Sequence, residues 1–159
     1  HHMDKQSFTT KYLPAARMAG ELYGMNPVVI LAQAAIESGW GKSRLATCYN
    51  NFFGLTGYGV SNAYWHGGKT DLDNPGGLVF RRYDRAENSF LDFARLIATA
   101  YKQAAAVSNY PRAYAREMAY SKYISEVNGD NREAYCNMLE SIARSLVPIV
   151  YNLNNKAYE

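Results

Sequence analysis

The sequence predicts an α+β protein, mainly helical, with a small β-hairpin lobe beside a central buried helix. Three observations predict this fold. Val28–Ile36 is almost unbroken apolar sequence, and a helix that is apolar all round is a buried helix. Ser61–Tyr83 is rich in turn residues and is the least helical stretch. Most of the remaining chain carries apolar residues at helical spacing, and 159 residues suffice for one domain with a core.

The central helix is expected over Pro27–Ser38. Asn26 suits its N-cap, Pro27 its first position and Gly39 the left-handed residue that ends it. Glu37 lies in its last turn, where burial and the helix dipole both disfavour a negative charge. The pKa of Glu37 should therefore be raised, as a general acid requires. The plain alternative is an exposed glutamate at a frayed helix end.

Shorter helices flank the central one. Ser7–Tyr23 reads as a helix that Pro14 either starts or kinks. Only a short loop separates it from the central helix, so the two should pack as neighbours. Ser43–Cys48 can form one further turn.

The loop Asn50–Gly59 is rich in glycine and aromatic residues. Phe52, Phe53 and Tyr58 would expose apolar area in a plain turn unless they pack or bind. We expect a loop whose aromatic residues partly enter the core and whose amides line a groove.

Asn74–Gly77 is a turn signal between two extended arms, Lys69–Leu72 and Leu78–Tyr83. A short hairpin or a three-stranded lobe is expected here. Asp71 and Asp73 lie on the first arm, where strand alternation would put both on one face.

The rest of the chain is predicted to be helical. Asp84 and Glu87 have the spacing of a capping box that begins a helix to about Gln103. Pro111 opens a short helix. Asp130 begins a last helix that Pro148 ends or kinks.

Composition narrows the function classes. The chain has 14 tyrosines beside six phenylalanines and two tryptophans, and tyrosine suits a groove that binds polar rings such as sugars. The formal charge of +3 permits an anionic partner, but no Lys/Arg run indicates nucleic-acid binding and no apolar run is long enough to span a membrane. Cys48 and Cys136 show no metal-binding spacing, and either a disulfide or two free thiols is possible. We expect neither a metal nor a cofactor.

Two motifs carry a family resemblance. AQAAIESGWGKSRLA (Ala32–Ala46) followed by NNFFGLTG (Asn50–Gly57) resembles glycoside hydrolase family 73, the endo-β-N-acetylglucosaminidases of autolysin and flagellar peptidoglycan hydrolase type. FRRY (Phe80–Tyr83) and ENSFLDF (Glu87–Phe93) match its later, looser motifs. The resemblance extends from Phe8 to about Leu146 and implies a lysozyme-like fold with a groove between two lobes.

The resemblance also implies roles for individual residues. Glu37 would be the general acid, and Asn51, Phe53 and Gly54 would form the loop that shapes the groove and binds substrate. Tyr120 would be the groove tyrosine of the family's Y-x-x-D-x-x-Y motif, and Tyr123 a packing residue. The spacing of these two tyrosines is shorter than in the family, and no aspartate lies between them.

A second departure concerns the second carboxylate. Many members carry a glutamate after a threonine on the hairpin, whereas this chain has Asp71 after Thr70, with Asp73 as the alternate. Glycoside cleavage needs a proton on the leaving oxygen and negative charge or an activated water near the cation-like transition state. Asp71 would activate water if the two carboxyls lie roughly 6.5–9.5 Å apart. Alternatively, the substrate's own N-acetyl group attacks and Asp71 only assists.

Three functions remain open on this evidence. The first is cleavage of the β-1,4 bond after N-acetylglucosamine in peptidoglycan. The second is muramidase or lytic transglycosylase activity on the same polymer, and the third is a catalytically impaired cell-wall-binding module. We expect residues 4–159 to form one catalytic domain, with His1–Met3 a cloning remnant. We also expect an exported monomer, periplasmic or in the cell wall, whose partner is the glycan strand, without membrane insertion.

Overall fold

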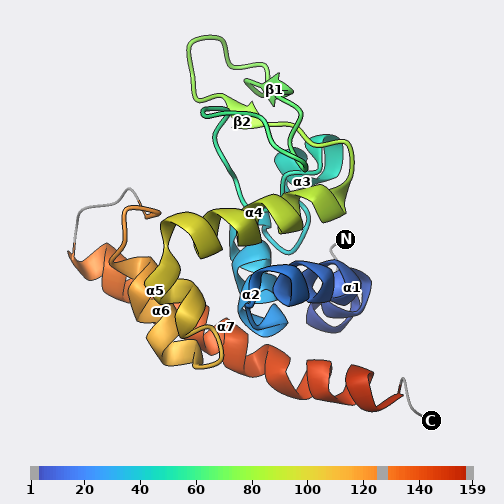
Figure 1. Ribbon diagram of the computed structural model, residues 1–159, viewed down its shortest axis with the longest axis vertical. Helices are drawn as coiled ribbons and strands as arrows, with labels where there is room; N and C mark the ends of the chain where they lie inside the picture. Colours follow the sequence, from blue (N-terminus) through green and yellow to red (C-terminus); the bar gives the residue numbers. More distant parts are fainter. Residues whose placement is uncertain (1–3, 125–128, 157–159) are drawn as a thin grey trace.

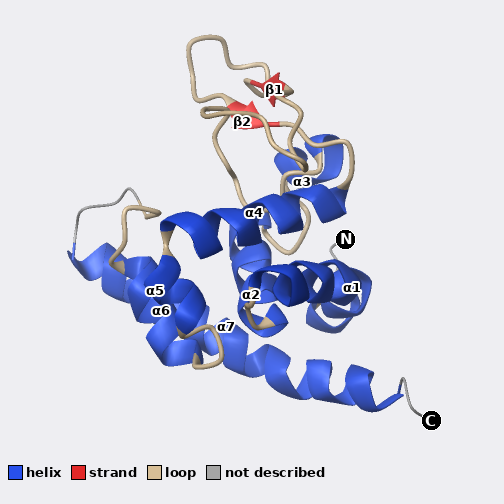
Figure 2. Cartoon of the chain, in the orientation of Figure 1, coloured by secondary structure: helices blue, strands red, loops and turns tan. Residues whose placement is uncertain are grey.

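The computed structural model describes residues 4–124 and 129–156, which fold into two lobes (Figure 1). Helices form the larger lobe, and the segment between α3 and α4 forms the smaller one, which is mostly loop (Figure 2). The predicted fold class is confirmed. In chain order the elements are α1 (Lys5–Tyr23), α2 (Pro27–Ser38), α3 (Arg44–Tyr49), β1 (Lys69–Thr70), β2 (Phe80–Arg81), α4 (Ala86–Ala100), α5 (Lys102–Ala106), α6 (Pro111–Ala119) and α7 (Gly129–Lys156).

Helix α2 is the central element, as its apolar sequence predicts. Every residue from Val28 to Ala35 is buried, and the helix packs against α1 and α7. The side chain of Asn26 accepts a hydrogen bond from the Val28 amide at 2.8 Å. Gly39 ends the helix at φ +58°, a conformation that costs glycine least. Both caps are the predicted ones, so the position of Glu37 in the last turn of the helix follows from local sequence.

The β-sheet is the short hairpin of the two predicted alternatives, with strands shorter than the predicted arms. Lys69 pairs with Arg81 and Thr70 with Phe80 in an antiparallel register, and Thr56 adds an isolated bridge to Phe80. Because each strand has only two residues, side-chain contacts and turns hold most of the small lobe together.

The expectation that Asp71 and Asp73 share one face of a strand is wrong. Both residues follow β1 in a turn, in which Leu72 and Asp73 have φ of +55° and +58°. The Asp71 carboxylate accepts a hydrogen bond from the Asp73 amide at 2.9 Å. Aspartate favours such a turn because its short side chain can bond the backbone two residues on.

The predicted capping box of α4 does not form. Arg85 is the N-cap residue and makes no side-chain cap bond. Asp84 instead pairs with His66 at 3.0 Å, and Glu87 pairs with Arg85 at 2.6 Å. The helix ends at Ala100 rather than near Gln103, and α5 follows after one residue.

Two prolines lie inside helices. Pro14 lies within α1, and α7 continues past Pro148 to Lys156, so neither residue ends its helix. The side chain of Asp130, predicted to begin the last helix, lies outside the described residues.

A buried carboxylate joins the two lobes. Asp92 of α4 is fully buried and accepts hydrogen bonds from Arg81 at 2.7 Å and Tyr83 at 2.5 Å. Asn62, in the loop before β1, also donates to it at 2.9 Å, and Arg95 donates to it from within α4. Because charge-assisted bonds are the strong ones, this cluster is the main polar attachment of the small lobe to α4.

Both cysteines are free thiols, Cys48 exposed and Cys136 buried. None of the helices in the described ranges is long and apolar enough to cross a membrane.

Candidate active site

A cleft of about 410 Å³ opens where the C-terminal end of α2 meets the first loop of the small lobe. The α4–α5 junction and the segment after α6 complete its walls, and α7 contributes one residue. Aromatic and aliphatic side chains dominate the lining, and one carboxylate lies among them. The lining residues are Glu37, Phe53, Gly54, Leu55, Thr56, Leu96, Tyr101, Lys122, Tyr123, Ile124 and Tyr135.

Glu37 is the only acid that lines this cleft among the described residues, and it is half-buried. Burial raises the pKa of its carboxyl group, and a hydrogen bond from the Tyr135 hydroxyl to Oε2, 2.9 Å long, opposes that rise without cancelling it. The side chain therefore keeps its proton to a higher pH than an exposed glutamate does. An acid of this kind can protonate a leaving group.

The loop after α3 is organised by Asn51. Its buried side chain accepts from the amides of Phe53, Gly54 and Leu55 and donates to the carbonyls of Leu55 and Arg81. All of its hydrogen-bonding capacity is used inside the protein, so Asn51 shapes the loop rather than reaching the cleft. Gly54 has φ +69° and lines the cleft.

Phe53 forms part of the cleft floor. It is 2% exposed and stacks on Phe93 with ring centroids 4.1 Å apart. The aromatic loop thus enters the core, as its sequence predicts, and leaves backbone at the cleft surface.

The structure exchanges the predicted places of two tyrosines. Tyr123 lines the cleft, its ring packs edge-on against Phe93 and Tyr101, and its hydroxyl donates to the Phe53 carbonyl at 3.4 Å. Burial and the charge of Glu37 raise its pKa well above the usual value. Tyr120 lies outside the cleft, 49% exposed, and donates to Glu133 at 2.6 Å. Tyr120, the predicted groove residue, therefore does not line this cleft, because α6 ends at Ala119 and the following turn directs the later tyrosine inward.

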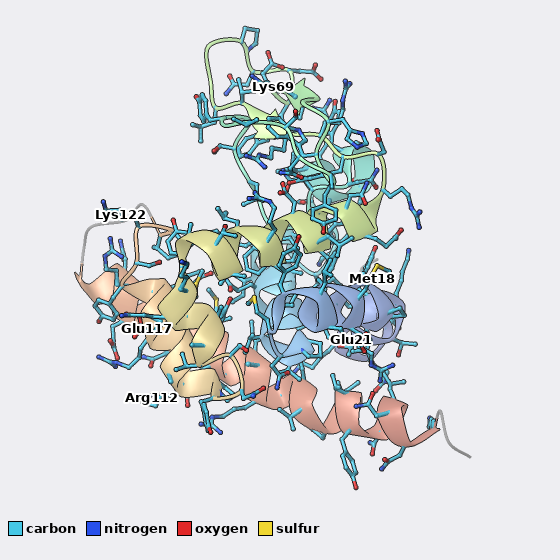
Figure 3. All side chains as sticks on the ribbon, viewed as in Figure 1. Met18, Glu21, Lys69, Arg112, Glu117 and Lys122 are labelled. Atoms are coloured by element: carbon cyan, nitrogen blue, oxygen red, sulfur yellow. The ribbon has the colours of Figure 1, made fainter. Side chains whose placement is uncertain are left out.

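Arg132 of α7 holds this turn in place. Its guanidinium donates to the carbonyls of Ala119, Ser121 and Ile124 at 2.7, 3.0 and 3.2 Å. A planar cation with several donors can fix an irregular segment that has no regular backbone pairing. Lys122 projects from the same segment (Figure 3) and brings a positive charge to the cleft.

The structure does not bring Asp71 into this cleft. Asp71 lines a separate hollow with Lys69, Thr70 and Val79, in the small lobe around β1 at the top of Figure 1. Asp73, the alternate, forms an exposed ion pair with Arg44 at 2.5 Å. The described residues include no group of three or more His, Cys, Asp or Glu side chains placed to hold a metal ion.

Tyr135 is the site residue that sequence reasoning missed. Tyr135 has helical spacing with Leu139, Ile142 and Leu146, and a residue on such an apolar face usually packs in the core. The available signal was its hydroxyl, because a buried tyrosine hydroxyl needs a hydrogen-bond partner. That partner is Glu37, 98 positions earlier in the chain.

A sequence model of the glucosaminidase family, described as mannosyl-glycoprotein endo-beta-N-acetylglucosaminidase, matches residues 13–147. The chain belongs to this family. The glucosaminidase match spans the central helix, the cleft and the small lobe, and it agrees with the resemblance to glycoside hydrolase family 73.

The curated relatives are longer than this chain. Peptidoglycan hydrolase FlgJ of Pseudomonas aeruginosa is 26% identical over 154 residues, which cover 87% of this chain and 36% of that protein. A putative endo-beta-N-acetylglucosaminidase of Streptococcus pneumoniae serotype 4 is 50% identical over 40 residues, 25% of this chain and 6% of that protein. The chain thus spans about a third or less of the length of these relatives.

The fold is similar to a solved glycoside hydrolase domain of Salmonella typhimurium FlgJ. The TM-score is 0.70 at 23% sequence identity, over 98% of this chain and 96% of that one. At this identity the likeness establishes the lysozyme-like fold.

Proposed function

We propose that the chain is a peptidoglycan hydrolase that cleaves the β-1,4 bond after N-acetylglucosamine, with Glu37 as general acid. The observation that carries the proposal is a half-buried carboxyl group, whose pKa burial raises, in an aromatic cleft of a glucosaminidase-family chain. The names of the relatives, peptidoglycan hydrolase and endo-beta-N-acetylglucosaminidase, support the same substrate.

The chemistry follows from the cleft. Protonated Glu37 donates to the glycosidic oxygen as the bond to the anomeric carbon breaks, and that carbon is attacked by a water that the second carboxylate activates or by the substrate's own N-acetyl group, which water then displaces. The Tyr135 hydroxyl then stabilises the carboxylate that is left. Tyr123 offers apolar surface to sugar rings, and Gly54 lets the backbone approach them closely.

The second carboxylate is proposed to be Asp71. Its place outside the Glu37 cleft means that it can act only after the small lobe closes over the substrate. Asp73 is already engaged by Arg44, which supports Asp71 over its neighbour. Asp71→Asn should then lower kcat about 10²–10⁴-fold, the usual weight of one acid–base group.

Asp73→Asn is the matched control and should leave kcat within a factor of two or so, as exposed changes usually do. Steady-state kinetics on purified peptidoglycan measures both variants. The opposite ranking would remove Asp71 from the reaction.

A second candidate is muramidase or lytic transglycosylase activity. The observation that favours it is the single acid in the cleft, because a transglycosylase needs no second carboxylate to activate water. A catalytically impaired wall-binding module is the third candidate. In each case the partner is the glycan strand, and we propose that the protein acts as an exported monomer in the periplasm or cell wall.

Mass spectrometry of digested peptidoglycan tests all three. Products with N-acetylglucosamine reducing ends support the proposal. Reducing or anhydro muramic ends would instead support the second candidate. If the wild-type protein yields no products, like the Glu37→Gln control, the third candidate is favoured.

A further inference from the structure

A buried polar chain leads from the core to the candidate acid. Gln33 and Tyr114, one on α2 and the other on α6, are both fully buried. The Tyr114 hydroxyl donates to Gln33 Oε1, and Gln33 Nε2 donates to the Tyr135 hydroxyl at 3.3 Å. The Tyr135 hydroxyl donates in turn to Glu37 Oε2 at 2.9 Å. Three helices thus contribute one continuous series of hydrogen bonds.

Tyr114 sets the direction of the whole series. Among the residues that the structure describes, Gln33 Oε1 is the only acceptor of its hydroxyl proton. If the Gln33 amide turned over, its Nε2 would face Tyr114, and that buried hydroxyl would lose its acceptor. Leaving a buried donor unsatisfied is costly. The amide is therefore held with Nε2 toward Tyr135.

The direction at Gln33 decides the direction at Tyr135. A tyrosine hydroxyl has one proton, and the lone pair that faces Gln33 is already accepting. The proton must point to Glu37 Oε2, so that oxygen accepts. We propose that Gln33 and Tyr114 are positioning residues that direct the Tyr135 proton to Glu37 Oε2 and leave Oε1 to carry the catalytic proton toward the cleft.

The other groups that face Glu37 do not replace this bond. Tyr123 and Lys122 approach from the segment after α6, and Tyr101 approaches from the α4–α5 junction. None of these three forms a hydrogen bond to Glu37 among the described residues. The loop between Phe53 and Thr56 contributes no titratable side chain. Loss of the Tyr135 bond should therefore raise the pKa of Glu37, since that bond stabilises the charged form.

The test is a titration of the Glu37 carboxyl carbon by ¹³C NMR, with Glu37→Gln used for the assignment. Tyr135→Phe should raise the pKa by about one unit, and Tyr114→Phe by about half a unit, because Gln33 can then turn over. Gln33→Met removes the amide, allows protonated Glu37 to donate to Tyr135, and should also raise the pKa; it serves if Tyr114→Phe does not fold. The basic limb of the pH profile of kcat/KM should move in the same direction.

A double variant distinguishes positioning from a general structural effect. Tyr114→Phe with Tyr135→Phe should titrate as Tyr135→Phe alone, because Tyr114 acts through Tyr135. Tyr23→Phe, which removes a half-buried hydroxyl bonded to Tyr64 outside the cleft, should leave the pKa unchanged. Additive shifts, or a Tyr114→Phe pKa equal to that of Tyr23→Phe, would overturn the proposal.

The inference rests on the proposed function of Glu37, but the two can fail separately. The NMR titration needs no turnover, so it tests the hydrogen-bond series from Tyr114 to Glu37 even in a protein without hydrolase activity. Conversely, muropeptide products identify the reaction even if the Glu37 pKa is unchanged in Tyr114→Phe and Gln33→Met.

Discussion

Glu37 and Asp92 are two carboxyl groups withdrawn from water in opposite ways. Glu37 is half-buried and receives one hydrogen bond, from a neutral hydroxyl, so burial dominates and its pKa is raised. Asp92 is fully buried, yet its bonds from Tyr83 and the guanidinium of Arg81 outweigh burial and lower its pKa. The comparison shows that the hydrogen-bond donors around a buried carboxyl group, rather than the extent of its burial, decide whether its pKa is raised or lowered.

The two acids should accordingly fail in different ways. Glu37 should be needed for catalysis and contribute little to the free energy of unfolding. Asp92 should contribute to the free energy of unfolding and take no part in proton transfer. Four predictions test this contrast.

The largest expected effect is on turnover. Glu37→Gln preserves the shape of the side chain but cannot donate a proton as an acid does, so kcat should fall at least about 100-fold. Circular dichroism and glycan binding should stay as in the wild type. A variant that keeps a tenth of the activity would remove Glu37 as the general acid.

The next effect is on folding. Asp92→Asn leaves the nearly buried guanidinium of Arg81, 11% exposed, without its counter-charge, and should lower the free energy of unfolding by about 3–5 kcal/mol. Asp73→Asn breaks a matched Asp–Arg pair whose Asp side chain is 79% exposed, and should leave the free energy of unfolding nearly unchanged. Urea denaturation compares them, and equal losses would mean that Asp92 is not the lobe attachment.

Removing one tyrosine hydroxyl near each acid should affect kcat near Glu37 and stability near Asp92. Tyr123→Phe should lower kcat about tenfold with little change in stability, since its hydroxyl bond to the Phe53 carbonyl is long. Tyr83→Phe should lower stability by about 1.5–3 kcal/mol, because its hydroxyl donates to a charged group. Tyr120→Phe, an exposed control, should alter neither kinetics nor thermal unfolding, and a kinetic effect there would restore Tyr120 to the groove.

The smallest effect is the pH dependence of stability, where the two acids have opposite signs. The pKa of Asp92 lies below its ordinary value of 3.8, so its contribution is present above that pH and is lost as the pH falls. The pKa of Glu37 lies above 4.5, so its contribution is present below pH 4.5 and is lost as the pH rises through the folded-state pKa. Glu37→Gln should therefore become more stable than the wild type as the pH rises toward neutrality. A stability difference that does not change with pH would show that the Glu37 pKa is not raised.

Local sequence alone determined the central helix and the place of Glu37 on it. An unbroken apolar run has to be buried, and Asn26, Pro27 and Gly39 set both ends by their own backbone and capping preferences. The aromatic loop Asn50–Gly59 was equally predictable from sequence, because Asn51 organises it through backbone amides two to four positions away. For the same reason the predicted fold class holds.

Tertiary structure decided everything that depends on partners far along the chain. Tyr135 meets Glu37 across 98 positions, and Asp92 meets Arg81 through the fold of the small lobe. Asp84 has capping-box spacing, yet its side chain bonds His66 instead, a partner 18 positions earlier that the fold brings beside it. The exchange of Tyr120 and Tyr123 depended on a turn held by Arg132 from another helix. Periodicity reports which face of a helix is buried, but only the packed chain shows which polar atom each buried hydroxyl or carboxylate meets.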